Sequence, residues 1–69
     1  MTKLALNNLG ELVRETQDGS IMDRAMALGA AAMMARILKE SGEIDLDSYI
    51  RLCGLFEVAE TRIRKEMAL

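Results

Sequence analysis

Residues 27–38 read ALGAAAMMARIL, an apolar run with five alanines, one glycine, two adjacent methionines and a single charged residue, Arg36. A helix that is apolar around its whole circumference is typical of a buried position. The run is too short to cross a bilayer, because Asp23, Arg24 and Arg36 bracket only residues 25–35, and a transmembrane helix needs about 20 apolar residues. We therefore expect a central, buried helix and no membrane partner.

The limits of this central helix are marked by capping signals. Ser20, with Asp23 three residues later, is typical of a helix start, and Gly42 is typical of a helix stop. These signals predict a helix over residues 21–41.

Two further helices are predicted from apolar residues at helical spacing. The first covers residues 8–17, with Asn8 and Glu11 as its N-terminal cap pair, and leaves residues 1–7 unassigned. The second covers residues 46–67 and is capped by Asp45. Their apolar stripes are Leu6, Leu9, Leu12, Val13 and Thr16 in the first helix, and Tyr49, Leu52, Cys53, Phe56, Ala59, Ile63 and Met67 in the second.

The predicted fold is a single all-α domain over residues 1–69, an antiparallel helical hairpin preceded by an N-terminal helix. Both connections are short, so neighbouring helices should run antiparallel. A chain of 69 residues is near the lower limit for burying enough surface to fold alone. Because it has one cysteine and no histidine, a disulfide framework or a zinc site is not expected to supply the missing stability.

Self-association is the remaining source of stability, and the central helix suggests how it occurs. Two flanking helices cannot enclose a helix that is apolar on all sides, so we expect a second copy to cover it in a helical-bundle homodimer. Small side chains permit a close approach of two helix axes. The predicted dimer interface consists of Met22, Ala25, Met26, Gly29, Ala32 and Met33. The alternative is a compact monomeric three-helix bundle with an alanine-rich central helix. Separately, the spacing of the methionines beside Ile37 favours a role as core filler over a recognition surface.

Chemical activity has little support in the sequence, and we expect no catalytic residue, metal or cofactor. Cys53 has no histidine to act as its base, and its place on an apolar stripe predicts a buried, unreactive thiol. The two Gly-x-Ile turns lack the oxygen ligands of a calcium-binding loop. Opposite charges recur at i,i+4 spacing in Asp47 and Arg51, Glu60 and Arg64, and Arg62 and Glu66, a pattern typical of solvated helix faces.

A second stripe on the last helix is not needed for the predicted core. It consists of Arg51, Leu55, Val58 and Arg62, and aliphatic side chains framed by arginines are favoured at protein interfaces. We therefore expect a protein–protein interaction module, a small regulator, adaptor or inhibitor such as bacteria, plasmids and phages encode. The missing disulfide framework and an N-terminus without a basic-then-apolar leader favour a cytoplasmic location. A net charge of −2 disfavours binding to phosphate backbones. The alternatives are a dimeric RNA- or DNA-binding regulator and a small structural subunit of a larger assembly.

Overall fold

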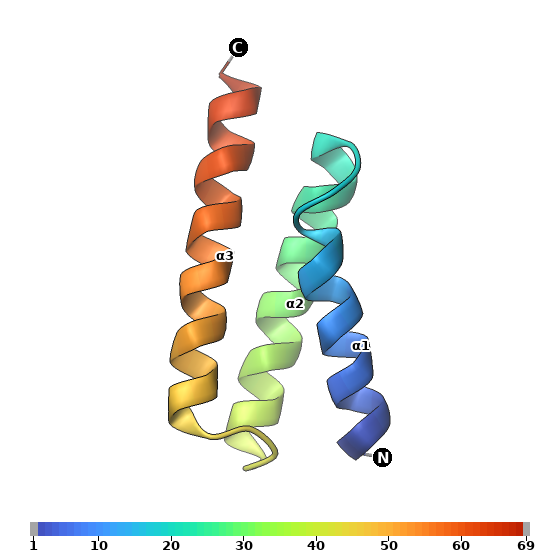
Figure 1. The fold of residues 1–69 in the computed structure, drawn as a ribbon, viewed down its shortest axis with the longest axis vertical. Coiled ribbons are helices and arrows are strands. Elements are labelled where there is room, and N and C mark those ends of the chain that lie inside the picture. The colour runs from blue at the N-terminus through green and yellow to red at the C-terminus, as the bar shows by residue number, and fades with distance from the viewer. Residues whose placement is uncertain (1, 69) are drawn as a thin grey trace.

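The computed structural model describes residues 2–68, which form three helices joined by two short turns. Helix α1 covers Thr2–Glu15, α2 covers Ile21–Glu40 and α3 covers Leu46–Met67. The helices run up, down and up, and α2 lies between the other two (Figure 1). Helix α2 packs against both neighbours, whereas α1 and α3 make little contact with each other. The predicted all-α, antiparallel three-helix chain is thus confirmed.

Two of the predicted caps are present. The Ser20 hydroxyl accepts a hydrogen bond from the Asp23 amide (3.1 Å), and the Asp45 carboxylate accepts one from the Ser48 amide (2.8 Å). Each satisfies an amide that has no partner inside its helix. The hydrogen bond from Ser48 holds the pKa of Asp45 below its usual range.

The turn after α2 reverses the chain at Gly42, which has φ +80°. The Glu43 amide donates to the Leu38 carbonyl (2.9 Å) and the Gly42 amide to the Lys39 carbonyl (3.1 Å), which is the pattern of a Schellman motif. Ile44 then packs against the core. The ammonium of Lys39 lies 5.1 Å from the centre of the Tyr49 ring, and this cation–π contact joins α2 to α3.

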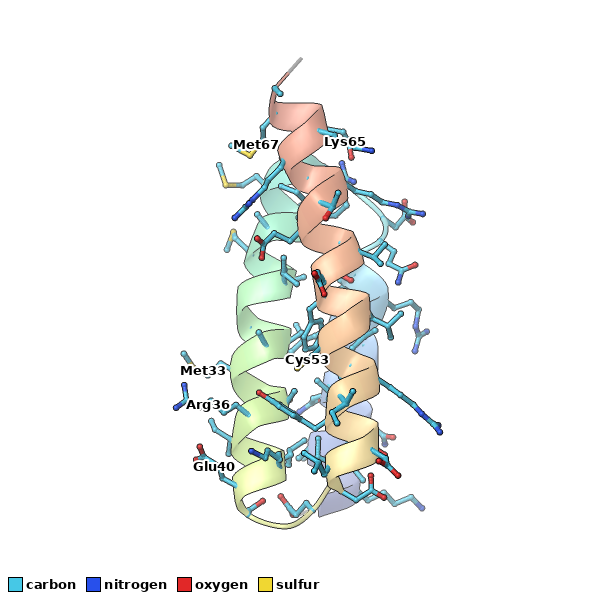
Figure 2. The ribbon with its side chains drawn as sticks, turned by 90° about the vertical axis from the view of Figure 1, so that its left-hand side faces the viewer. Met33, Arg36, Glu40, Cys53, Lys65 and Met67 are labelled. Carbon is cyan, nitrogen blue, oxygen red and sulfur yellow. The ribbon has the colours of Figure 1, made fainter. Side chains whose placement is uncertain are left out.

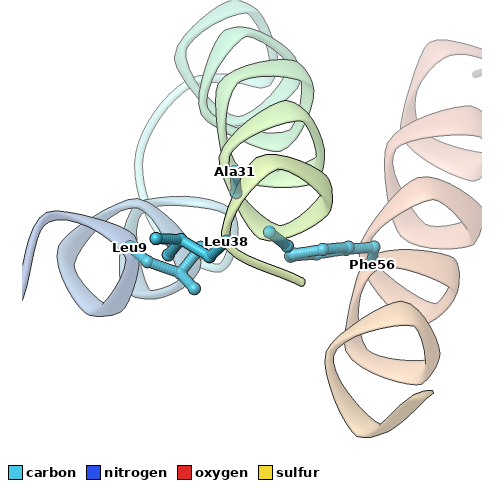
Figure 3. Packing of buried hydrophobic residues seen from close by; sticks show 5 residues of the cluster. Leu9, Ala31, Leu38 and Phe56 are labelled. Atoms are coloured by element: carbon cyan, nitrogen blue, oxygen red, sulfur yellow. The ribbon is translucent and has the colours of Figure 1, made fainter. Parts of the chain in front are cut away.

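The core lies under the inner face of α2, between α1 and α3. Leu9 of α1 lies beside Leu38 of α2, and Phe56 of α3 approaches from the opposite side, with Ala31 of α2 in the same cluster (Figure 3). Ala31 and Ala35 are completely buried, and no larger side chain among the described residues reaches that degree of burial. The buried apolar residues are Leu9, Ala27, Ala31, Ala35, Leu38, Phe56, Ala59 and Ile63. Half of them are alanines, so this core is thin.

Several details of the sequence prediction are wrong. Helix α1 begins at Thr2, so Asn8 lies in the middle of the helix and does not cap it. Cys53 is exposed, because it lies on the opposite flank of Phe56 from Ala59, the flank that turns away from the core. Met67 is 69% exposed in the last turn of α3. Met1 lies outside the described residues.

The accessible surface of the molecule is larger than that of a compact folded monomer of the same mass. Its Cα atoms extend over 40 × 20 × 13 Å, and its accessible surface is 5122 Å². A compact folded monomer of 7.6 kDa exposes about 4,300 Å². The excess of about 800 Å² follows from the elongated shape, in which three helices in one layer leave each other partly uncovered.

One ion pair fastens the start of α2 to the end of α3. Both terminal guanidinium nitrogens of Arg24 donate to the Glu66 carboxylate, each at 2.6 Å. The sequence pattern paired Glu66 with Arg62, but the carboxylate bonds instead to Arg24, which is 42 residues away along the chain. These hydrogen bonds hold the pKa of Glu66 below its usual range.

We expect Phe56→Ala to lower the free energy of unfolding by about 3–5 kcal/mol, because it removes the largest side chain from a thin core. Ile50→Ala is a matched control on the same helix, since Ile50 is 58% exposed, and it should change stability by less than about 0.5 kcal/mol. Urea titrations followed by circular dichroism measure both. Equal effects would mean that Phe56 does not lie in the core.

We expect the Arg24–Glu66 pair to stabilise the fold above the ordinary pKa of glutamate, about 4.3, and to lose this contribution as the pH falls through the lower pKa of the folded state. Thermal melts of the wild type and Glu66→Gln should therefore differ at pH 7 and converge in acid. The difference is modest because Glu66 is 42% exposed. A gap that is independent of pH would contradict this account.

Candidate interaction surfaces

The outer face of α2, defined here as Met22, Met26, Gly29, Met33 and Ile37, is apolar and uncovered. At 100° per residue these positions lie opposite the alanines that face the core. The three methionines are 67–69% exposed and Ile37 is 57% exposed. Met33 projects away from α3, with Arg36 and Glu40 below it (Figure 2). The apolar face ends near Arg36 and Glu40, which form an ion pair with 3.3 Å between Nε and Oε1.

A strip of small residues runs beside this outer face, on the flank nearer to α3. It consists of Ala25, Gly29 and Ala32, all exposed, and a Cβ at position 29 meets nothing within 4 Å. Between this strip and α3 lies an apolar groove. The groove is lined by Ala25, Leu28, Gly29, Ala32, Phe56, Glu60, Ile63, Arg64 and Met67. Glu60 and Arg64 are joined by a salt bridge of 2.7 Å.

All six residues of the predicted dimer interface lie on this one exposed side of α2. The related expectation that methionines fill the core is wrong for Met22, Met26 and Met33. Only Met34, among the methionines of α2, packs against the core cluster. Alanines occupy the inner face of α2. A methionine at those positions would hold α1 and α3 away from α2.

The predicted partner stripe, Arg51, Leu55, Val58 and Arg62, is exposed along α3. Leu55 is 44% exposed and Val58 is 55% exposed. The two arginines make no hydrogen bond or salt bridge with any other described side chain. The stripe therefore presents two aliphatic side chains between two available guanidinium groups.

The stripe borders a small hollow that the sequence did not indicate. Leu55, Val58 and Arg62 line it from α3, and Thr16, Gln17 and Arg24 line it from the other side. The Thr16 hydroxyl donates to the Val13 carbonyl (2.6 Å), and the Arg24 guanidinium donates to the Glu66 carboxylate. Arg62 adds a positive charge to the lining of the hollow.

The remaining candidates have no chemistry assembled around them. The exposed thiol of Cys53 lies one turn from Tyr49 and raises the pKa of that phenol through a hydrogen bond. Within residues 2–68, no group of three or more acidic or cysteine side chains is placed to hold a metal ion. In the same range, no helix has the length and apolar character needed to cross a bilayer.

Comparison with known proteins adds no relative to this description. The chain matches no protein-family model, and no curated protein or solved structure shows significant similarity to it.

Proposed function

We propose that this chain is a small protein–protein interaction module that works as a homodimer and acts as a regulator, adaptor or inhibitor of another protein. The observation that carries the proposal is the uncovered apolar outer face of α2. Exposed apolar surface of this extent marks interaction sites in soluble proteins. The thin core explains why association benefits the fold.

The stripe on α3 supplies a second contact, suited to a different protein. Arg51 and Arg62 can each pair with a carboxylate, while Leu55 and Val58 offer apolar contact between them. A partner with an acidic residue on either side of an aliphatic one fits this arrangement. Since Cys53 is an exposed free thiol, we place the module in a reducing compartment such as the cytoplasm.

We expect light scattering coupled to size exclusion to report about twice the 7.6 kDa chain mass at micromolar concentration. Met26→Glu combined with Met33→Glu should halve that mass, because burying carboxylates in an apolar seam is unfavourable. Asn7→Glu with Asn8→Glu adds the same charge to exposed positions of α1 and should leave the mass unchanged. A monomeric wild type at high micromolar concentration would refute the dimer.

We expect Leu55→Ser combined with Val58→Ser to keep the helical signal and to abolish recovery of the partner in an affinity purification from the native host. Substitutions at exposed positions usually change stability by less than about 0.5 kcal/mol. Ile50→Ser, on the same helix but outside the stripe, is the matched control and should retain the partner. If the double variant melts as early as Phe56→Ala, these two residues belong to the core and the stripe is not a partner site.

A further inference from the structure

We infer that the stripe on α3 binds an acidic amphipathic helix of another protein, in which two carboxylates flank two aliphatic side chains at the spacing of the stripe itself. This inference rests on the proposed function and names the chemistry of the partner at that surface. It follows from the spacing of Arg51, Leu55, Val58 and Arg62, from the charges around them and from the hollow beside them.

The four side chains of the stripe form a straight line along α3. Their separations are four, three and four residues, so all four lie within about 60° of one another around the helix axis. The line is about 16 Å long, which corresponds to three turns of helix. The spacing is the same when read from either end. A partner helix with an acidic, two aliphatic and an acidic residue at these separations therefore fits the stripe in either direction.

A helix suits this surface better than an extended segment. Leu55 and Val58 offer no hydrogen-bond partner, so an extended segment would lay unpaired amide and carbonyl groups over them. Leaving such groups buried and unpaired is costly. A helix pairs its backbone groups internally and presents only side chains to the stripe.

Charge complementarity selects carboxylates for the two ends of the partner's motif. Arg51 and Arg62 form no salt bridge with any other described side chain. Asp47, one turn before Arg51, is not bonded to it, and Glu66, one turn after Arg62, accepts hydrogen bonds from Arg24 instead. Both guanidinium groups of the stripe are thus available, and a guanidinium matches a carboxylate in a planar, bidentate pair.

The same pattern indicates that the occupant of the stripe is not a second copy of this chain. No two acidic residues of the sequence are 11 positions apart, so no helix of the chain carries the complementary motif. The stripe of a second copy would place arginine against arginine whichever way it ran, because both ends of the stripe are arginines. Contacts between like charges are unfavourable at an interface.

The hollow beside the stripe supplies an anchor for one aliphatic side chain of the partner. Leu55, Val58 and Ala59 form its apolar wall on α3, and Thr16 and Gln17 line it from the turn that follows α1. A helix that lies on the stripe therefore contacts both walls. Enclosed apolar anchors of this kind carry most of the binding energy when a helix binds in a groove.

Two labelled peptides test the chemistry of the partner. Both are helices of about 20 residues, built from alanine and glutamine, that contain the motif X-x-x-x-Leu-x-x-Leu-x-x-x-X, where X is glutamate in one peptide and lysine in the other. In fluorescence anisotropy titrations with the full chain at physiological ionic strength, we expect the glutamate peptide to bind at least about tenfold more tightly. The net charge of −2 attracts the lysine peptide at long range, so this preference requires a local cationic site.

Reversing the charges of the stripe locates that site. Arg51→Glu with Arg62→Glu should invert the preference, so that the lysine peptide binds at least about tenfold more tightly. Lys3→Glu with Arg36→Glu makes the same change in net charge at exposed positions outside the stripe and should keep the preference for glutamate. If circular dichroism shows that the reversed variant loses its helices, Arg51→Gln with Arg62→Gln takes its place and should abolish the preference.

Equal binding of the two peptides, or binding of neither, would overturn the inference. An equal response of the reversed variant and its control would also overturn it, because the preference would then reflect the charge of the whole chain. The proposed function is tested separately by Leu55→Ser with Val58→Ser. If that variant loses its partner although the peptides fail to bind, the stripe contacts a protein by other means than an acidic helix.

Discussion

Three alanines at four-residue spacing on the inner face of α2, Ala27, Ala31 and Ala35, determine how the rest of the chain is arranged. Methyl side chains let the flanking helices lie close to the backbone of α2, so that Leu9 and Phe56 join Leu38 in one core cluster. The same small side chains bury little apolar surface, and hydrophobic stabilisation scales with the area buried. The fold is therefore well defined in geometry but supported by a thin core.

The features predicted correctly from the sequence are those that depend on local contacts. Ser20 and Asp45 cap their helices through hydrogen bonds to amides three residues away, so no knowledge of the tertiary structure is needed. The start of α1 was not predictable in this way. Its first turns continue the apolar stripe through Ala5, which packs against the core, and no capping residue marks where that stripe begins.

The orientation of α2 could not be deduced from its pattern, because both of its faces are apolar. Hydrophobicity alone places methionine inside, but the volume available between two flanking helices selects alanine, and that volume is a property of the assembled fold. The exposure of Cys53 also depends on the assembled fold. The rotation of α3 about its own axis decides whether the thiol contacts α2 or water. The residues of both predicted interfaces are exposed, and the reason for their exposure is seen only in the structure.

Packing between helices adjacent in the chain, with little between α1 and α3, also has a consequence for how the protein folds. Every major contact closes through a single short turn, so the mean sequence separation of contacting residues is small. Helical chains of this kind fold on timescales of about microseconds to milliseconds. Helix α1 can detach from the α2–α3 hairpin without breaking a contact between those two helices. The Arg24–Glu66 ion pair and the Lys39–Tyr49 contact hold α3 to α2, so the N-terminal helix is the element expected to open first, and hydrogen exchange should be fastest there.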